Sequence, residues 1–148
     1  MTFPLLVFAQ VNDPYNKIPE FKRPQSLSSR QLPGIFKWEF WFERWKLELD
    51  SSGNYTQIVT DCTERDSSGG RWKFNGHQLI LENTSGTTVY DILQFRKFYL
   101  LVPVQYQKEF IKDIKGFLNE VKKSKDLNSD PAPYLLELTL TREIYPSS

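Results

Sequence analysis

The chain has 148 residues, a formal net charge of +1 and an aromatic content of 15%. Its length fits a single domain, and its near-neutral charge argues against a nucleic-acid-binding protein that works by counterion release. The single cysteine, Cys62, excludes an intrachain disulfide and favours a reducing compartment, so we expect a cytoplasmic protein, while export without disulfides fits the same count.

The first 33 residues differ from the rest, because five of the nine prolines lie there. Proline fixes φ and removes a backbone donor, so we expect an irregular N-terminal arm over residues 1–33, with one short strand at residues 5–9. The arm also holds scattered apolar side chains, and we expect part of it to pack against the domain. We place that domain, rich in β-strands, at residues 34–148.

Alternation of apolar and polar residues begins after Gly34. From Phe36 to Phe42 the even positions are apolar, whereas beyond Phe42 the apolar positions are odd. A one-residue slip reverses every side chain of a strand, so we interpret the change as a β-bulge near residues 42–44 of one long strand. Such bulges let a sheet curl into a barrel. A turn at residues 50–54, a strand from residue 55 to about residue 62 and a polar loop at residues 64–70 follow.

The strongest local signal is Asn75-Gly76, which lies between two alternating runs. Asn-Gly favours a type I′ turn, which needs positive φ at both central residues, so a two-residue hairpin loop is predicted. This register places Phe74 opposite His77 and Trp72 opposite Leu79. The apolar side chains then share one face of the hairpin: Trp72, Phe74, Leu79 and Leu81.

The rest of the chain adds strands and one change of period. We expect strands at residues 88–95 and 98–102, the second apolar on both faces and therefore buried. Apolar residues from Tyr106 to Val121 recur at helical spacing, which predicts an amphipathic helix over residues 105–125, with Gly116 packed closely against the sheet. A last strand follows at residues 134–144, and no run approaches the roughly 20 apolar residues of a membrane span. The predicted fold is mainly β, an antiparallel meander of about eight strands closing into a barrel, with one helix before the last strand.

The segment from Gly34 to Val102 resembles the bacterial lipocalin-like (calycin-type) barrels. The resemblance rests on the hairpin Leu47-Glu48-Leu49-Asp50-Ser51-Ser52-Gly53-Asn54-Tyr55 and on Gly70-Arg71-Trp72 before the tight turn. In true lipocalins the Gly-x-Trp motif lies on the first strand, whereas here it opens a middle hairpin. What the resemblance implies is a lipocalin-like β-barrel domain at residues 34–148, with a central cavity that binds a small molecule or a protein and no enzymatic activity.

Residues with reactive side chains form no pattern that predicts catalysis. No nucleotide-binding or nucleophile-elbow motif occurs, and we expect His77 at a hairpin edge and Cys62 as a buried structural thiol. The acidic residues after the second strand match no calcium loop, and we expect a solvated loop there. Two carboxylates of the first strand are expected to be outward solubilising charges. We therefore expect no catalytic residue, no metal site and no cofactor. The acidic residues considered are Asp61, Glu64 and Asp66 in the loop, and Glu39 and Glu43 on the strand.

The aromatic stretch from Trp38 to Trp45 places rings on both faces of a single strand. One set of rings should line the interior, and the other should be covered by the helix and the arm or be exposed as a contact patch. Our first hypothesis is a non-enzymatic binding protein that holds a small apolar ligand. The alternative is a protein-interaction module, of the immunity or inhibitor type, that acts through an exposed aromatic surface. Nothing in the sequence predicts an oligomeric state. The residues predicted to line the ligand site are Trp38, Phe40, Trp72, Phe74, Leu79 and Leu81.

Overall fold

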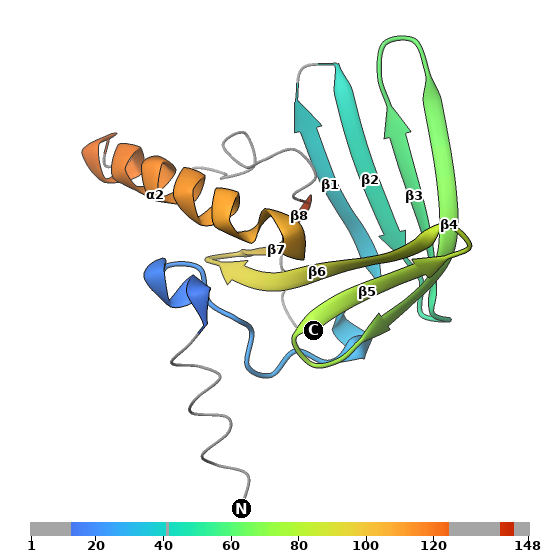
Figure 1. Ribbon diagram of the computed structural model, residues 1–148, viewed down its shortest axis with the longest axis horizontal. Coiled ribbons are helices and arrows are strands. Elements are labelled where there is room, and N and C mark those ends of the chain that lie inside the picture. Colours follow the sequence, from blue (N-terminus) through green and yellow to red (C-terminus); the bar gives the residue numbers. More distant parts are fainter. Residues whose placement is uncertain (1–12, 41, 125–139, 144–148) are drawn as a thin grey trace, which may run out of the picture.

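The structure, a computed structural model, describes residues 13–40, 42–124 and 140–143. Eight strands close into a barrel whose spatial order is the chain order, and every neighbouring pair is antiparallel (Figure 1). The mainly β meander with a helix before its last strand is therefore confirmed. The strands are β1 (Gly34–Phe40), β2 (Glu43–Leu49), β3 (Asn54–Thr60), β4 (Arg65–Phe74), β5 (Gln78–Asn83), β6 (Gly86–Phe95), β7 (Phe98–Pro103) and β8 (Leu140–Glu143).

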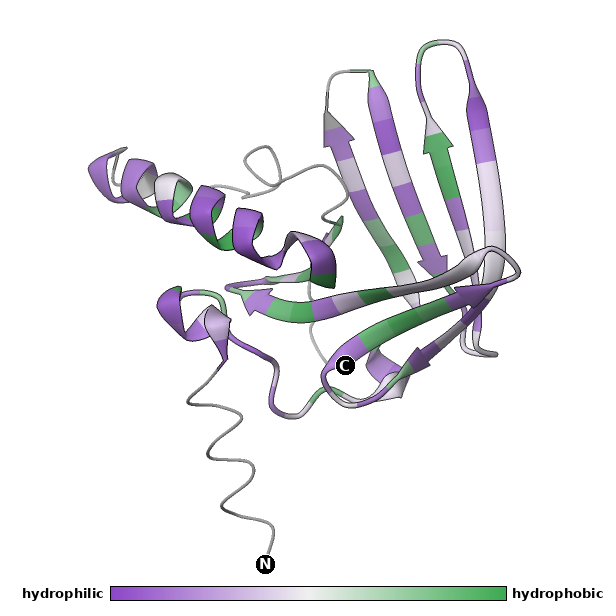
Figure 2. Ribbon diagram, viewed as in Figure 1, coloured by the Kyte–Doolittle hydropathy of each residue, from purple (hydrophilic) through white to green (hydrophobic). Residues whose placement is uncertain are grey.

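Helical segments come before β1 and after β7 in the chain. The long helix α2 spans Gln107–Ser124 and carries an apolar stripe on the side turned to the barrel (Figure 2). Short 3₁₀ turns are η1 (Pro14–Lys17), η2 (Ser29–Gln31) and η3 (Val104–Tyr106). The expected strand at residues 5–9, the last residue expected in the helix, Lys125, and most of the expected last strand lie outside the described residues.

The expected β-bulge near residues 42–44 is wrong, because the chain reverses there. β1 and β2 form a hairpin in which Phe40 pairs with Glu43 and Trp38 pairs with Trp45. The change from even to odd apolar positions follows from this turn, since both strands keep their apolar residues inward. Rings at Phe36, Trp38 and Trp45 thus share the inner face, instead of lying on both faces of one strand.

The hairpin after β4 has a different register from the one expected. Phe74 pairs with Leu79 and Trp72 with Leu81, because the Asn75 side chain caps a wider turn. Its Oδ1 accepts hydrogen bonds from the backbone N–H of His77 at 3.0 Å and of Gln78 at 2.7 Å. The shift from the predicted register is two residues, an even number, so each side chain keeps its predicted face.

The expected polar loop at residues 64–70 is also wrong. β4 begins at Arg65, and residues 65–71 pair in register with β3 despite their Ser- and Gly-rich sequence. β5 pairs with residues 71–74 of β4. The upper parts of β1–β4 therefore rise above β5 and β6 as a four-stranded wall (Figure 1).

A second apolar cluster lies outside the barrel. β6 and β7 bury both faces, as expected for the second of them, and their outward residues pack against α2 and against the arm. Tyr15, Ile18 and Phe21 of the arm are buried, which confirms that part of the arm packs on the domain. The Phe21 ring stacks on the Phe95 ring with their centroids 4.4 Å apart, and it meets the Phe110 ring edge-on with a centroid distance of 5.8 Å.

Gly116 of α2 does not pack closely against the sheet. The residue is exposed, and nothing lies within 4 Å of the position a Cβ would take, so the expected close packing is wrong.

Candidate ligand-binding interior

A buried arginine closes one end of the barrel, which we call the base. Arg142 of β8 is 6% exposed, and its guanidinium lies 4.6 Å above the Phe36 ring. Its Nη1 donates to the carbonyl of Leu32 at 2.7 Å, and its Nη2 donates to that of Gln31 at 2.6 Å. These charge-assisted hydrogen bonds tie the chain before β1 across the end of the barrel.

Gly34 makes room for this arginine. Its φ is +143°, and an added Cβ would lie 2.8 Å from Nη1 of Arg142. Any other residue would therefore meet both backbone strain and a collision with the guanidinium. The sequence offered no signal for this contact, because the partners of Arg142 are backbone carbonyls about 110 residues away.

Five of the six predicted ligand-site residues lie together on the inner face of the barrel. Trp38, Trp72, Leu79 and Leu81 are buried in one inner cluster, and half-buried Phe74 packs against it. Nε1 of Trp72 donates to the carbonyl of Asp50 at 2.9 Å, which fixes its ring against the turn between β2 and β3. The side chain of Phe40 lies outside the described part of the structure. The role of these residues in ligand binding stays a prediction.

A polar layer lies on the same inner face of the barrel. The Tyr55 hydroxyl accepts a hydrogen bond from Nδ2 of Asn83 at 2.9 Å. Burial, with the nearby Tyr55, raises the pKa of Tyr90 to about 12, although a hydrogen bond with Gln57 opposes the rise. The Tyr90 phenol is therefore a neutral hydrogen-bonding group at physiological pH. Gly70 lets β5 and the Tyr55 ring approach closely, because an added Cβ would lie 2.1 Å from the Glu82 carbonyl oxygen and 2.9 Å from the Tyr55 ring.

The other end of the barrel, which we call the mouth, leaves part of the inner face accessible. One row of paired residues crosses the wall from Trp38 to Trp45, Val59 and Asp66. Trp45 and Val59 are half-buried, although both lie on the inward side, and Asp66 is exposed. An apolar surface with polar neighbours is thus open to solvent at the mouth.

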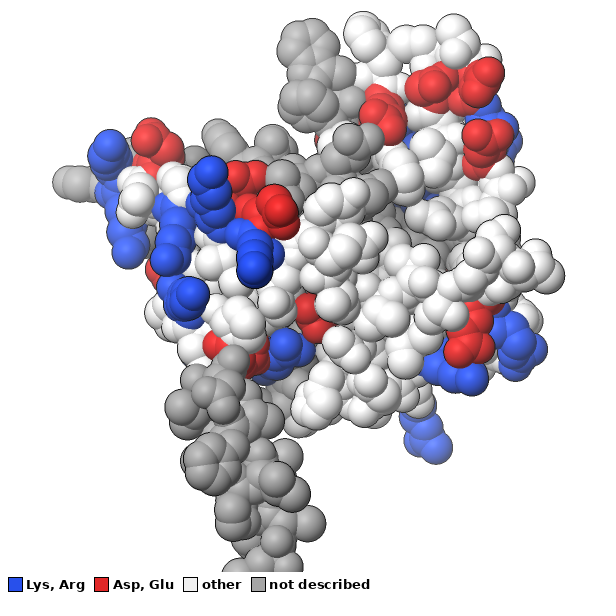
Figure 3. Space-filling view, viewed as in Figure 1, with Lys and Arg blue, Asp and Glu red and all other residues white. Residues whose placement is uncertain are grey.

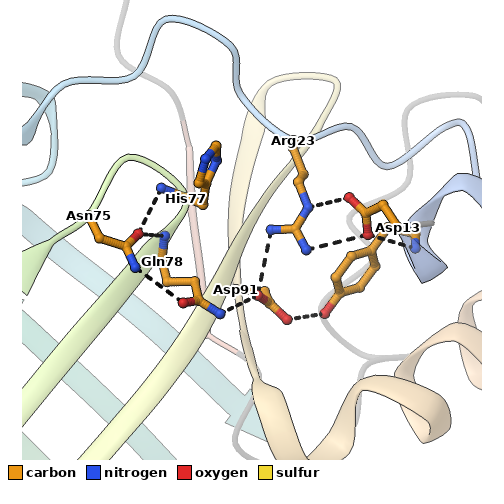
Figure 4. A network of polar contacts seen from close by, with 7 residues as sticks. Asp13, Arg23, Asn75, His77, Gln78 and Asp91 are labelled. Carbon is orange, nitrogen blue, oxygen red and sulfur yellow. Dashed lines mark hydrogen bonds and ion pairs between the residues drawn. The ribbon is translucent and has the colours of Figure 1, made fainter. Parts of the chain in front are cut away.

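A buried polar network lies on the outside of the barrel (Figure 4). Asp91 of β6 is 2% exposed and accepts hydrogen bonds from the Tyr15 hydroxyl at 2.7 Å and from Nε2 of Gln78 at 3.1 Å. Arg23 lies 3.5 Å from Asp91 and also pairs with Asp13. Burial tends to lower the pKa of Arg23, but the hydrogen bond and charge of Asp13, with the charge of Asp91, raise it overall.

This network clamps the arm to the barrel. Burial and then the charge of Asp91 raise the pKa of Tyr15 above its ordinary value, so Tyr15 stays a proton donor. A phenol held in its protonated form cannot serve as a general base. The network therefore joins residues 13–23 to β5 and β6, and sequence reasoning missed it because its members are far apart in the chain.

Other candidate residues have local structural roles. Cys62 is exposed in the turn after β3, so the expected buried thiol is wrong. His77 is exposed at the hairpin edge, as expected. Hydrogen bonds from the backbone of Thr63 and Glu64 lower the pKa of the Asp61 carboxyl, which caps its own turn. Within the described residues, no group of three or more His, Cys, Asp or Glu could hold a metal ion.

No family model, characterised protein or solved structure matches the chain. The closed eight-stranded antiparallel barrel is consistent with a calycin-like fold, as the resemblance implied. In the described segments, no helix is both long and apolar enough to cross a membrane.

Proposed function

We propose that the protein is a non-enzymatic binding protein that holds a small apolar ligand in the barrel interior. The observation that supports this most is the accessible inner face at the mouth, where Trp45 and Val59 are half-buried above a packed aromatic base. Apolar surface left open on the inner side of a barrel is typical of small-molecule sites.

A binding role suits the inner layer because the polar groups described there pair with one another. Asn83 donates to Tyr55, and Gln57 hydrogen-bonds to Tyr90. Neutral hydroxyl and amide groups of this kind orient a ligand, whereas catalysis of group transfer needs an activated nucleophile or a poised base.

A matched pair of substitutions tests the site. Val59 lies inward on β3 and its neighbour Ile58 lies outward, and both are half-buried. Val59→Trp fills the mouth, so we expect it to weaken binding of the neutral dye Nile red at least about tenfold, whereas Ile58→Trp leaves binding unchanged. Binding is measured by dye fluorescence, and native mass spectrometry of the purified protein looks for a retained ligand. Equal loss in both variants, or no binding by the parent, contradicts the proposal.

A second function is favoured by one observation. Phe42 is 71% exposed at the tip of the β1–β2 turn, and Val104 is 40% exposed beside a shallow groove of about 380 Å³. An exposed ring and an apolar groove suit a protein-interaction module. That function predicts that Val59→Trp leaves partner binding intact, while Phe42→Ser weakens it.

A further inference from the structure

The basic residues of β1–β4 all lie on the outer face, whereas the acidic residues lie on both faces. Because side chains alternate along each strand, residues that share a face with the buried apolar positions point inward and their neighbours point outward. The two inward charges that β1–β4 carry, Glu43 and Asp66, are both acidic, so the outward position expected for Glu43 is wrong. The basic residues of the same strands all point outward: Lys37, Arg44, Lys46, Arg65, Arg71 and Lys73.

The charge of the side chains that face the mouth follows from this arrangement. Acidic side chains gather over the upper ends of β3 and β4 with basic ones beside them, and α2 also carries side chains of both signs (Figure 3). Arg142, the described basic residue inside the barrel, lies at the base and is bound to backbone carbonyls. A ligand that enters at the mouth therefore meets negative charge first.

Aromatic rings lie beside these carboxylates. Trp45 and Trp38 are cross-strand partners on the inner face, and Nε1 of Trp45 donates to Oε1 of Glu43 at 2.8 Å. This hydrogen bond fixes the edge of the indole and places a carboxylate next to it. Asp66 lies in the same row of paired residues, across Val59. Indole faces attract cations, and the half-buried carboxylate of Glu43 strengthens that preference.

We propose that the ligand of the interior is a hydrophobic organic cation, with an alkylammonium head between Trp45 and the two carboxylates and its apolar tail toward the inner cluster. This inference rests on the proposed binding function and adds the charge of the ligand. A head group that also carries phosphate is disfavoured, because the carboxylates repel it.

The test compares ligands that share one tail. Binding of n-octyltrimethylammonium, n-octanol, n-octanoate and n-octylphosphocholine is measured by calorimetry and tryptophan fluorescence, each below its micelle concentration. We expect the cation to bind at least about tenfold more tightly than octanol, and octanoate to bind most weakly. Phosphocholine binding that equals that of the simple cation would instead indicate a lipid head group and overturn the inference.

Substitutions assign the preference to residues. Glu43→Gln and Asp66→Asn should each weaken cation binding by about threefold to tenfold and leave octanol binding unchanged, which also shows that the variants fold. Glu48→Gln, on the outer face of β2, is the matched control and should change neither. If the cation, alcohol and carboxylate bind equally, the cation inference fails and the binding function stands. If none of the four binds, both fail.

Discussion

Tyr15 is a buried proton donor whose ionisation the fold opposes. Its hydroxyl donates to Asp91 at 2.7 Å, and both side chains are almost completely buried. Removing the hydroxyl leaves a buried carboxylate with fewer donors, so Tyr15→Phe should lower the free energy of unfolding by about 1–3 kcal/mol. Urea denaturation at neutral pH measures the change, and Tyr106→Phe, in exposed η3, is the control. An unchanged midpoint for Tyr15→Phe would show that the clamp contributes nothing.

The same tyrosines predict a loss of stability in alkali. Burial raises the pKa of Tyr15 and raises that of Tyr90 to about 12, from an ordinary value of 10.0. A raised folded-state pKa means that the unfolded chain releases its proton first, so this stability is complete below pH 10 and is lost as the pH rises from there toward 12 and beyond.

Urea denaturation between pH 9 and about pH 11 checks this dependence. The fall in unfolding free energy should be shallower in Tyr15→Phe and in Tyr90→Phe than in the parent. A Tyr106→Phe protein should follow the parent, and identical slopes in all four proteins would contradict the assignment.

Substitutions at Gly34 and Gly86 together separate the effect of backbone strain from the effect of contact with Arg142. Their φ values are +143° and +144°, but only at Gly34 would an added Cβ meet a neighbour within 4 Å, the Arg142 guanidinium. Gly34→Ala should therefore lower the free energy of unfolding by about 1 kcal/mol or more beyond the effect of Gly86→Ala. Thermal and urea unfolding of the two variants measure the difference. Equal losses would mean that Arg142 moves aside without cost.

At the scale of elements, Phe21 joins the arm, β6 and α2. It stacks on Phe95 and meets Phe110 edge-on. Phe21→Ala leaves a cavity among three elements and should lower the free energy of unfolding by about 3–5 kcal/mol. Phe42→Ala, at an exposed turn, should have little effect. If Phe21→Ala is as mild as Phe42→Ala in urea denaturation, the arm is not part of the cooperative core.

The elements also show what alternation can and cannot predict. Alternation assigned the inward residues of β4 and β5 correctly, and the two-residue error at Asn75 left every face unchanged. The turn between β1 and β2 was missed because residues around Phe42 include no Gly, Pro, Asn or Asp to signal it. The Ser- and Gly-rich start of β4 has low strand propensity, and pairing with β3 overrides it.

The candidate site was predictable only in part for the same reason. The buried rings Trp38 and Trp72 follow from alternation, but Trp45 and Glu43 join the inner face only once the chain reverses between β1 and β2. The Arg142 closure and the Tyr15–Asp91 clamp join residues far apart in the chain, and no local pattern signals such contacts.

At the scale of the whole molecule, the barrel has two differently built ends. Arg142 and the chain before β1 close the base, while the wall of β1–β4 leaves its inner face accessible at the mouth. The arm and α2 cover the outside of β6 and β7, away from that wall. The outer cluster is thus separate from the inner face at which we propose that the ligand binds.

Fluorine NMR of the protein labelled with 5-fluorotryptophan tests this central claim most directly. Each tryptophan gives one resonance, and single Trp→Phe variants assign them. When n-octanol or n-octyltrimethylammonium is added, the Trp45 resonance at the mouth should shift most and saturate with the binding curve, since its inward ring is half-buried. Saturable binding that leaves the Trp45 and Trp38 resonances unmoved would place the ligand elsewhere and contradict the account.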